Sequence, residues 1–355
     1  MSETTGPQGT ASPGPAQARS KRRDPGRKHA PTIYDIAELA GFNPSTVSRA
    51  LSQPGRVSAK TQKIIEDAAA ELNYQVNIFA RALPTGRTQT IGLIVSGITN
   101  PAHFDVIRGA ETTSAARNHT LMLADSRESA ELELTAAHRM LTSVDGLVLV
   151  SPRLSDEELQ RLAAKKPVAV INRRVEGVPS VVAEMNVGVT DAVQYLATLG
   201  HAEIAYVAGP QRSWMSQSRW ESISARCEWS GILATLLGSG EPTVDGGRKA
   251  AAAVKAGSAT AVFCYNDLMA IGLLRELLAA GVKVPGEISI IGFDNIFGSD
   301  FTTPPLSTIK SPLYESGAAA LNLILELLDN GESHQKVPLL RTELVLRGST
   351  GAISR

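Results

Sequence analysis

The segment Pro31-Thr-Ile-Tyr-Asp-Ile-Ala-Glu-Leu-Ala-Gly-Phe-Asn-Pro-Ser-Thr-Val-Ser-Arg-Ala-Leu51 decides how the N-terminal part of this chain folds. Apolar residues recur at helical spacing on both sides of Gly41, which breaks the pattern. Thr32 is placed to cap the first helix, and Ser58 is placed to cap a third helix further along. Three short helices with a Gly-containing turn between the first two predict a helix-turn-helix, whose second helix enters the DNA major groove.

The charge of the chain is divided between a basic N-terminal part and an acidic remainder. Residues 1–87 contain twelve Lys and Arg against seven Asp and Glu, whereas the whole chain has 35 of each and no net charge. This asymmetry favours a polyanion-binding module attached to a second body, although a basic tail without a partner would give the same pattern. Residues 1–30 are rich in Gly, Pro, Ser, Thr and Ala, which predicts a disordered tail.

From Thr90 onward, short β-branched runs alternate with helical patterns, which predicts two parallel sheets covered by helices on both faces. The expected strands are 91–95, 121–124, 147–150, 168–171, 204–207, 261–264 and 288–291. The expected helices are 104–118, 130–143, 155–165, 187–199, 267–280 and 314–329, and Ser155 with Glu158 forms a capping box at the start of one of them.

Polar residues follow several of the predicted strands directly. Doubly wound sheets bind ligands beyond the carboxyl ends of their strands, so we expect these residues to line a cleft between two lobes. They are Ser96, Asp125, Ser151, Asn172-Arg173, Asn266-Asp267 and Asp294-Asn295.

Several other classes of protein are disfavoured by the sequence. Cys227 and Cys264 lie far apart and the six histidines show no metal spacing, so we expect buried free thiols, no metal and no cofactor. No nucleophile elbow, P-loop or dinucleotide fingerprint is present, which argues against an enzyme. The polar N-terminus and the lack of a long apolar run predict a cytoplasmic protein without a membrane anchor.

The opening segment resembles the headpiece of the LacI/GalR family of bacterial regulators. The resemblance continues through the chain in Arg56-Val-Ser-Ala-Lys-Thr61, Leu72-Asn-Tyr74, Asn100-Pro101, Val144-Asp-Gly-Leu-Val148, Leu199-Gly-His201, Asn266-Asp-Leu-Met-Ala270, Ile291-Gly-Phe-Asp-Asn295, Pro305-Leu-Ser-Thr-Ile309 and Leu346-Arg-Gly-Ser-Thr350. It therefore spans about residues 31–350, which is nearly everything outside the tail.

The resemblance implies that Pro44, Ser45 and Arg49 read base edges. A guanidinium can donate two parallel hydrogen bonds to guanine, worth about 1–3 kcal/mol of discrimination. The alternative for Arg49 is a phosphate contact or a solvated helix face. The resemblance also implies that a second set of residues contacts the DNA backbone: Thr32, Tyr34, Thr46, Ser48, Arg56, Ser58, Thr61 and Asn77. For Thr32 and Ser58 the alternative is helix capping.

Residues 77–83 resemble the hinge helix of the family. The resemblance implies that Leu83 wedges into a central base step in the minor groove and that Ala80 packs beside it. Val76 stands where the family usually has a proline, and Pro84 closes the helix early. The alternative is that Leu83 belongs to an ordinary linker.

The resemblance implies a ligand pocket in the body, similar to that of periplasmic sugar-binding proteins. Arg219, Asp294 and Asn266 occupy pocket positions, and their donors and acceptors suit the hydroxyl groups of a saccharide. Asp294 would otherwise cap a turn. Trp214 is placed to stack on a sugar ring or else to pack in the core. The other expected lining residues are Ala102, His103, Ser151, Asn172 and Arg173.

The sequence thus predicts an α/β chain, with an all-α helix-turn-helix headpiece and a two-lobed, doubly wound effector domain of the periplasmic-binding-protein type. The expected divisions are a basic tail at 1–30, the DNA-binding domain at 31–75, a hinge and linker at 76–88, and the effector and dimerisation domain at 89–350. The expected function is a homodimeric repressor of carbohydrate-utilisation genes, released from double-stranded operator DNA by a saccharide. A corepressor-dependent regulator and a sugar-binding protein without a DNA role are the alternatives.

Overall fold

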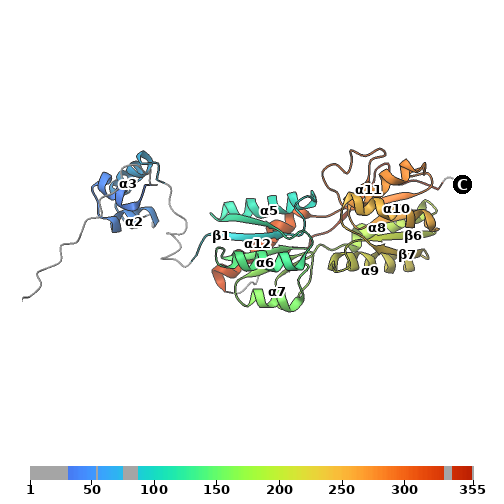
Figure 1. Cartoon of the computed structure of the whole chain (residues 1–355), viewed down its shortest axis with the longest axis horizontal. Helices are drawn as coiled ribbons and strands as arrows, with labels where there is room; N and C mark the ends of the chain where they lie inside the picture. Colours follow the sequence, from blue (N-terminus) through green and yellow to red (C-terminus); the bar gives the residue numbers. More distant parts are fainter. Residues whose placement is uncertain (1–30, 53–54, 75–86, 332–337, 354–355) are drawn as a thin grey trace, which may run out of the picture. The chain divides into compact units, whose positions relative to one another are not determined.

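The computed structural model describes residues 31–52, 55–74, 87–331 and 338–353, which form two compact units on either side of residues 75–86 (Figure 1). The predicted tail at 1–30 and most of the predicted hinge at 76–88 lie outside the described residues. Each unit is described by itself below.

The N-terminal unit, called the headpiece here, contains α1 (Ile33–Ala40), α2 (Pro44–Ser52) and α3 (Ala59–Glu71). Gly41 ends α1 in the left-handed conformation at φ 72°, which a residue without a side chain adopts at no steric cost. The three helices pack around a small core of Ile36, Ala37, Val47, Ala50, Ile65 and Ala68. The predicted helix-turn-helix is present at these residues.

The larger unit, called the body here, has two lobes, each built on its own sheet. The first sheet contains β1 (Thr90–Val95), β2 (Thr120–Asp125), β3 (Gly146–Val150), β4 (Val168–Ile171) and β5 (Ser180–Val181) in the order β2-β1-β3-β4-β5. All of its strand pairs are parallel. Helices α5 (Ala102–Ala116) and α12 (Leu313–Asn330) cover one face, while α6 (Ala130–Leu141) and α7 (Asp156–Ala163) cover the other.

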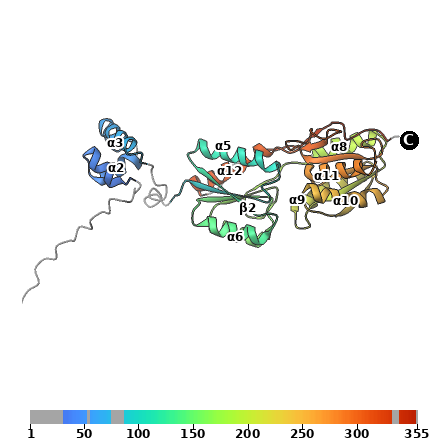
Figure 2. The ribbon, with the colours of Figure 1, turned by 45° about the horizontal axis from the view of Figure 1, so that its top comes forward.

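The second sheet contains β6 (Glu203–Ala208), β7 (Leu233–Ser239), β8 (Ala261–Cys264), β9 (Ser289–Asp294), β10 (Ser307–Lys310) and β11 (Glu343–Val345). The strand order is β11-β10-β9-β8-β6-β7, and only β11 runs antiparallel, against β10. Helices α8 (Asn186–Thr198) and α9 (Trp214–Trp229) pack together, as do α10 (Val244–Ala256) and α11 (Asp267–Ala279) (Figure 2).

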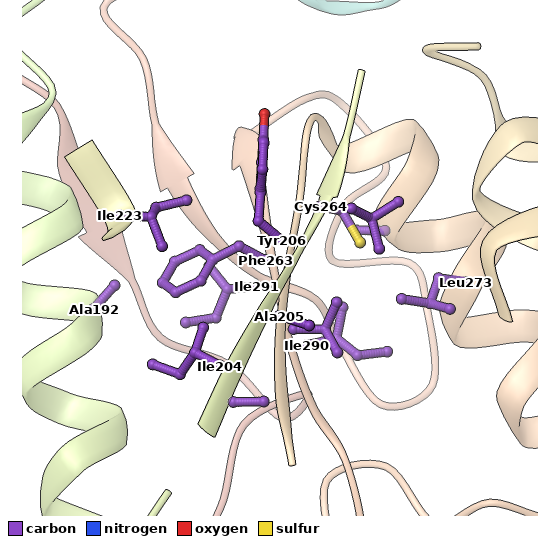
Figure 3. Close-up of a cluster of buried hydrophobic side chains, with 14 of the residues drawn as sticks. Ala192, Ile204, Ala205, Tyr206, Ile223, Phe263, Cys264, Leu273, Ile290 and Ile291 are labelled. Carbon is purple, nitrogen blue, oxygen red and sulfur yellow. The ribbon is translucent and has the colours of Figure 1, made fainter. Parts of the chain in front are cut away.

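The core of the second lobe is a continuous cluster of aliphatic and aromatic side chains on both sides of the sheet. Figure 3 shows Phe263 and Ile291 from neighbouring strands beside Ile204 and Ile223. Cys227 and Cys264 are both buried and unpaired, as the sequence predicts. The described part of the chain has no helix with the length and apolar character needed to span a bilayer.

The chain passes between the lobes three times, through residues 182–185, through residues 311–312, and after α12 through a segment whose described part is 338–342. The first and third passages are joined by main-chain hydrogen bonds, because Glu184 N–H donates to the Leu340 carbonyl at 2.7 Å and Thr342 N–H donates to the Glu184 carbonyl at 3.1 Å. Narrow connections of this kind allow two lobes to change their relative angle while each keeps its own core.

The strands and helices predicted for the body are all present, with ends that differ by at most three residues, but the sequence analysis missed several elements. The predicted hinge helix at 77–83 lies outside the described residues. It gave no helix at α9 or α10 and no strand at β5, β7, β10 or β11. The predicted capping box is present, with the Ser155 hydroxyl accepting from Glu158 N–H and the Glu158 carboxylate accepting from Ser155 N–H.

Candidate DNA-binding face and ligand cleft

Two of the predicted base-reading side chains project from the same side of α2. Ser45 and Arg49 are exposed and lie one helical turn apart, on the side opposite the buried Val47 and Ala50. Pro44 is half-buried at the start of the helix. The headpiece core therefore leaves Ser45 and Arg49 free to meet a partner, and base reading by them stays a prediction.

The residues expected to hold the DNA backbone surround this face to different extents. Thr32, Tyr34, Arg56 and Ser58 are exposed, while Thr46, Ser48 and Thr61 are half-buried. Ser58 caps α3, because its hydroxyl accepts from Thr61 N–H at 3.2 Å, and the Thr32 hydroxyl donates to Asp35 at 2.6 Å. A residue that caps a helix can also contact a DNA phosphate, since a helix N-terminus itself attracts phosphate. Asn77, Ala80 and Leu83 lie outside the described residues.

Seven of the nine predicted ligand residues line one cavity between the lobes, called the cleft here: Ala102, His103, Ser151, Asn172, Arg219, Asn266 and Asp294. The inner cavity has a volume of about 30 Å³, which is room for about one water molecule. It shares Ser96, Asn100, Glu128 and Pro242 with a mouth of about 610 Å³. The lobes are therefore closed on each other, and a sugar ring would enter the inner cleft only when they separate.

A buried ion pair organises the second-lobe wall of the cleft. Arg219 Nη2 donates to Asp294 Oδ1 at 2.8 Å, and Arg219 Nη1 donates to the Tyr265 carbonyl. The guanidinium also lies over the rings of Phe293 and Tyr265, at 4.4 and 5.0 Å from their centroids. Burial acts to lower the pKa of Arg219, but Asp294 and neighbouring phenols outweigh it, and the pKa is raised. Arg219 therefore stays charged and fixed in one orientation.

The strand ends that form the cleft carry left-handed backbone at residues that are not glycine. Ser151 has φ 50°, Asn172 φ 61° and Asp294 φ 99°, and Glu128 has φ 61°. Such conformations cost about 1–3 kcal/mol each and cluster at ligand sites, where the surrounding structure holds them. This strain points to the cleft as the functional part of the body.

His103 is buried in the cleft and uncharged. Burial lowers its pKa to about 4, even though Asp294 and Asp125 act to raise it. Its Nε2 atom lies 3.4 Å from the Ser96 hydroxyl, whereas Nδ1 has no hydrogen-bond partner among the described residues. A buried ring nitrogen without a partner is a candidate hydrogen-bonding group for a ligand.

Both asparagines of the cleft have partners within the protein. The Asn266 side chain caps α11 by accepting from Met269 N–H at 2.9 Å, and it donates to the Pro242 carbonyl at 3.1 Å. The Asn172 amide donates to the Ser151 hydroxyl at 3.2 Å. Each amide oxygen retains a lone pair, and each amide nitrogen retains a second hydrogen, for a ligand.

Two predicted ligand residues do not line the cleft. Arg173 turns away from it, because its guanidinium donates to the Pro152 and Leu154 carbonyls and pairs with Asp156 at 2.6 Å. Trp214 begins α9 and lines a separate cavity of about 700 Å³ beside α8. It packs there against the core of the second lobe, which corresponds to the alternative named from the sequence. Neither residue lines the inner cavity, and a ligand contact by either of them stays a prediction.

The residues that the sequence analysis missed include two that line the cleft and one arginine that is buried beside them. Glu128 lines both the inner cavity and its mouth, and Tyr265 lines the inner cavity from the other lobe. Arg153 is buried beside them, with Nε donating to Glu128 Oε2 at 2.7 Å. Glu128 and Arg153 each lie three residues after the end of a strand, β2 and β3 respectively. Considering the three residues after each strand, instead of only the first one or two, would have identified both.

Glu133 provides a test of the electrostatics around the cleft. Its carboxylate accepts from Arg153 N–H at 2.7 Å, and burial raises its pKa from 4.5 to about 7. A raised carboxyl pKa means that the folded state holds a proton that the unfolded state releases. This part of the stability is present below about pH 4.5 and is lost as the pH rises to about 7.

We expect the free energy of unfolding to fall less steeply with pH in Glu133→Gln than in the unsubstituted protein, by roughly 2–3 kcal/mol across that window. Urea unfolding at a series of pH values measures this difference. Glu131→Gln, on the exposed side of the same helix, is the matched control and is expected to follow the unsubstituted protein. An unchanged pH slope in Glu133→Gln would contradict the raised pKa.

Comparison with known protein families matches both units. Residues 32–77 match the family model described as bacterial regulatory proteins, lacI family. Residues 193–350 match the model described as a periplasmic binding protein-like domain.

Curated relatives match over nearly their full length. The HTH-type transcriptional repressor CytR of Escherichia coli (strain K12) is 33% identical over 332 residues, which cover 91% of this chain and 97% of that protein. The HTH-type transcriptional regulator GalR of the same strain is 29% identical over 331 residues, covering 91% of this chain and 96% of that protein.

Solved structures share the architecture. The lac repressor dimer bound to operator and the anti-inducer ONPF superposes with a TM-score of 0.81 at 28% identity, covering 91% of this chain and all of that chain. A LacI family regulator from Enterococcus faecium with bound ribose superposes with a TM-score of 0.65 at 30% identity, covering 74% of this chain and 98% of that chain. This chain belongs to the lacI family of bacterial regulatory proteins and is a DNA-binding transcriptional regulator with a helix-turn-helix headpiece and a periplasmic-binding-protein-like body.

Proposed function

We propose that this regulator is a homodimeric repressor of carbohydrate-utilisation genes that a saccharide releases from its operator. The observation that carries this proposal is the buried pair in the cleft between Arg219 of α9 and Asp294, which ends β9 with a φ of 99°. Fixed guanidinium and carboxylate groups, with His103, Ser151 and Asn172 opposite them, offer the donors and acceptors that sugar hydroxyls need. Ribose is bound in a similar regulator from Enterococcus faecium, which supports the class of ligand.

The proposed coupling acts through the angle between the lobes. A saccharide does not fit the closed cleft of about 30 Å³, so its binding selects a different separation of the lobes. The three narrow passages transmit that change to the N-terminal edge of the body, where the chain leads towards the headpiece. Hinge residues 77–83, with Leu83 inserted between base pairs, are proposed to leave the minor groove when the lobes move.

On the DNA side, Arg49 and Ser45 are proposed to read bases while the residues around them hold the phosphates. Their exposure on one side of α2 supports this role. A homodimer would place two headpieces on a nearly palindromic operator. Support for a dimer comes from the lac repressor dimer and from Phe297 and Phe301, which are 76% and 70% exposed and form an edge-to-face pair.

The proposal also includes a cytoplasmic location and the absence of enzymatic activity, since the relatives are named as transcriptional regulators. The principal alternative is a corepressor-dependent regulator, in which the ligand raises the affinity for operator DNA instead of lowering it. The same cleft residues serve both directions of control, and measuring operator affinity with and without the ligand distinguishes them.

The test is fluorescence anisotropy of a labelled fragment from the DNA upstream of the gene, titrated with the full chain at fixed salt and then challenged with mono- and disaccharides. We expect one sugar of the panel to release the DNA. Tighter binding in the presence of a sugar would establish the corepressor alternative. DNA binding that no sugar alters would remove the saccharide from the proposal and leave the DNA-binding regulator.

A further inference from the structure

Arg153 and Glu128 form a second ion pair on the first-lobe side, in which Glu128 lines the cleft and Arg153 is buried beside it. The guanidinium donates to Glu128 Oε2 at 2.7 Å through Nε and to the Ser151 carbonyl at 2.8 Å through Nη1, while its Nη2 lies 2.6 Å from the same Glu128 oxygen. The Arg153 side chain is only 3% exposed. Burial acts to lower its pKa, but Tyr265 and Glu128 outweigh burial and raise it, so the guanidinium remains charged.

The two cations beside the inner cleft are therefore both neutralised by the protein. Arg219 is paired with Asp294 across 2.8 Å, and Arg153 is paired with Glu128. His103, the remaining basic side chain that lines the inner cavity, has a pKa lowered to about 4 and is neutral. An anion that entered this space would lose its hydration without gaining an unpaired positive charge.

The mouth of the cleft adds a negative field. Three carboxylates line it, from Asp125, Glu128 and Glu241, against the single guanidinium of Arg127. Clefts lined mainly by one sign of charge repel ligands of that sign over several ångströms. Glu128 belongs to both the mouth and the inner cavity, but Arg153 compensates its charge, so the net negative charge of the mouth comes from Asp125 and Glu241 against Arg127.

We propose that Glu128, positioned by Arg153, sets the charge specificity of the cleft, which accepts uncharged polyhydroxylated molecules and excludes phosphorylated ones. This inference rests on the proposed function, since it concerns the ligand of the same cleft. Glu128 offers a carboxylate to ligand hydroxyls, and Arg153 holds that carboxylate in place. Removing the charge of Glu128 leaves Arg153 as an unpaired cation and turns an anion-excluding cleft into one that attracts phosphate.

The test compares each neutral sugar of the panel with its phosphate ester, and adds inorganic phosphate as a third probe, by calorimetric titration of the full chain near neutral pH. We expect the sugar that binds to lose about ten-fold or more in affinity when it is phosphorylated. In Glu128→Gln this difference shrinks or reverses, and the affinity for inorganic phosphate rises by about ten-fold. Equal or tighter binding of the phosphate ester by the unsubstituted protein would overturn the proposal.

Two further variants separate charge specificity from a general loosening of the cleft. Arg153→Met removes the cation and leaves Glu128, so it is expected to gain no affinity for phosphate, whereas loosening alone would admit phosphate in both variants. Glu131→Gln makes the same chemical change outside the cleft and is expected to behave as the unsubstituted protein. If no neutral sugar binds, the saccharide proposal fails on its own, and the inference stands or falls on whether Glu128→Gln gains affinity for inorganic phosphate.

Discussion

Replacing Asp294 by alanine is expected to abolish the release of operator DNA by the effector, while operator binding in the absence of effector remains. The carboxylate holds Arg219 at 2.8 Å and accepts from the Ser311 hydroxyl at 3.2 Å. Its loss removes a ligand acceptor and also frees the Arg219 guanidinium from its orientation. The headpiece has its own core, so the substitution leaves the DNA-reading face intact.

The same substitution is expected to destabilise the body, because it leaves a buried guanidinium without its partner. Breaking a buried pair in this way costs about 3–5 kcal/mol. The double variant Arg219→Met with Asp294→Leu replaces both charges by apolar side chains and is expected to recover most of that stability without recovering the effector response. Anisotropy with and without effector, beside thermal unfolding of both variants, separates the two effects. A normal effector response in Asp294→Ala would remove Asp294 from the ligand site.

Replacing Arg49 by alanine is expected to weaken binding to the specific operator by about 1–3 kcal/mol at each half-site, which is roughly five- to 150-fold. In a dimer both half-sites lose the contact, so the total loss is larger still. Arg49 is exposed on α2 beside Ser45, so its removal leaves the headpiece core untouched. Binding to unrelated DNA is expected to change little, because a base contact carries sequence information that a phosphate contact lacks.

Arg56→Ala is the matched control, since Arg56 is an exposed arginine of the same headpiece with a predicted phosphate role. It is expected to weaken binding to specific and to unrelated DNA alike. It is also expected to reduce the slope of log affinity against log salt concentration by about one. Arg49→Lys keeps the positive charge but loses the two-pronged geometry, so it is expected to resemble Arg49→Ala in specificity. A uniform loss across sequences in Arg49→Ala would reassign Arg49 to the phosphates.

Local patterns in the sequence account for the headpiece and for most of the sheet strands. Ser58 at the start of α3 and Gly41 at the end of α1 act within a few residues of themselves, so their effects can be read along the chain. The buried strands β1, β3 and β4 are short β-branched or aliphatic runs with Ser96, Ser151 and Asn172 directly after them. That arrangement was enough to predict which strand ends meet in the cleft.

The missed elements depend on contacts that are distant in the sequence. Helix α10 contains Gly246 and Gly247 in its first turn, and glycine ordinarily disfavours helix. A side chain at Gly247 would lie 1.9 Å from the Met269 carbonyl oxygen of α11, so the close packing of the two helices requires this glycine. Strand β11 has three residues and is defined by its pairing with β10, across more than thirty residues of chain.

The sequence by itself determined the headpiece and the two-lobed α/β body, because capping, periodicity and strand ends are local. The same strand ends indicated four of the cleft residues, Ser151, Asn172, Asn266 and Asp294, whereas Ala102, His103 and Arg219 were implied by the family resemblance. Only the tertiary structure decided the charge state of that cleft. Arg153 meets Glu128 across 25 positions of the chain, and Arg219 meets Asp294 across 75. The same folding that brings these pairs together removes Trp214 and Arg173 from the cleft, since the side to which a helix or loop turns its side chains is set by what packs beneath it.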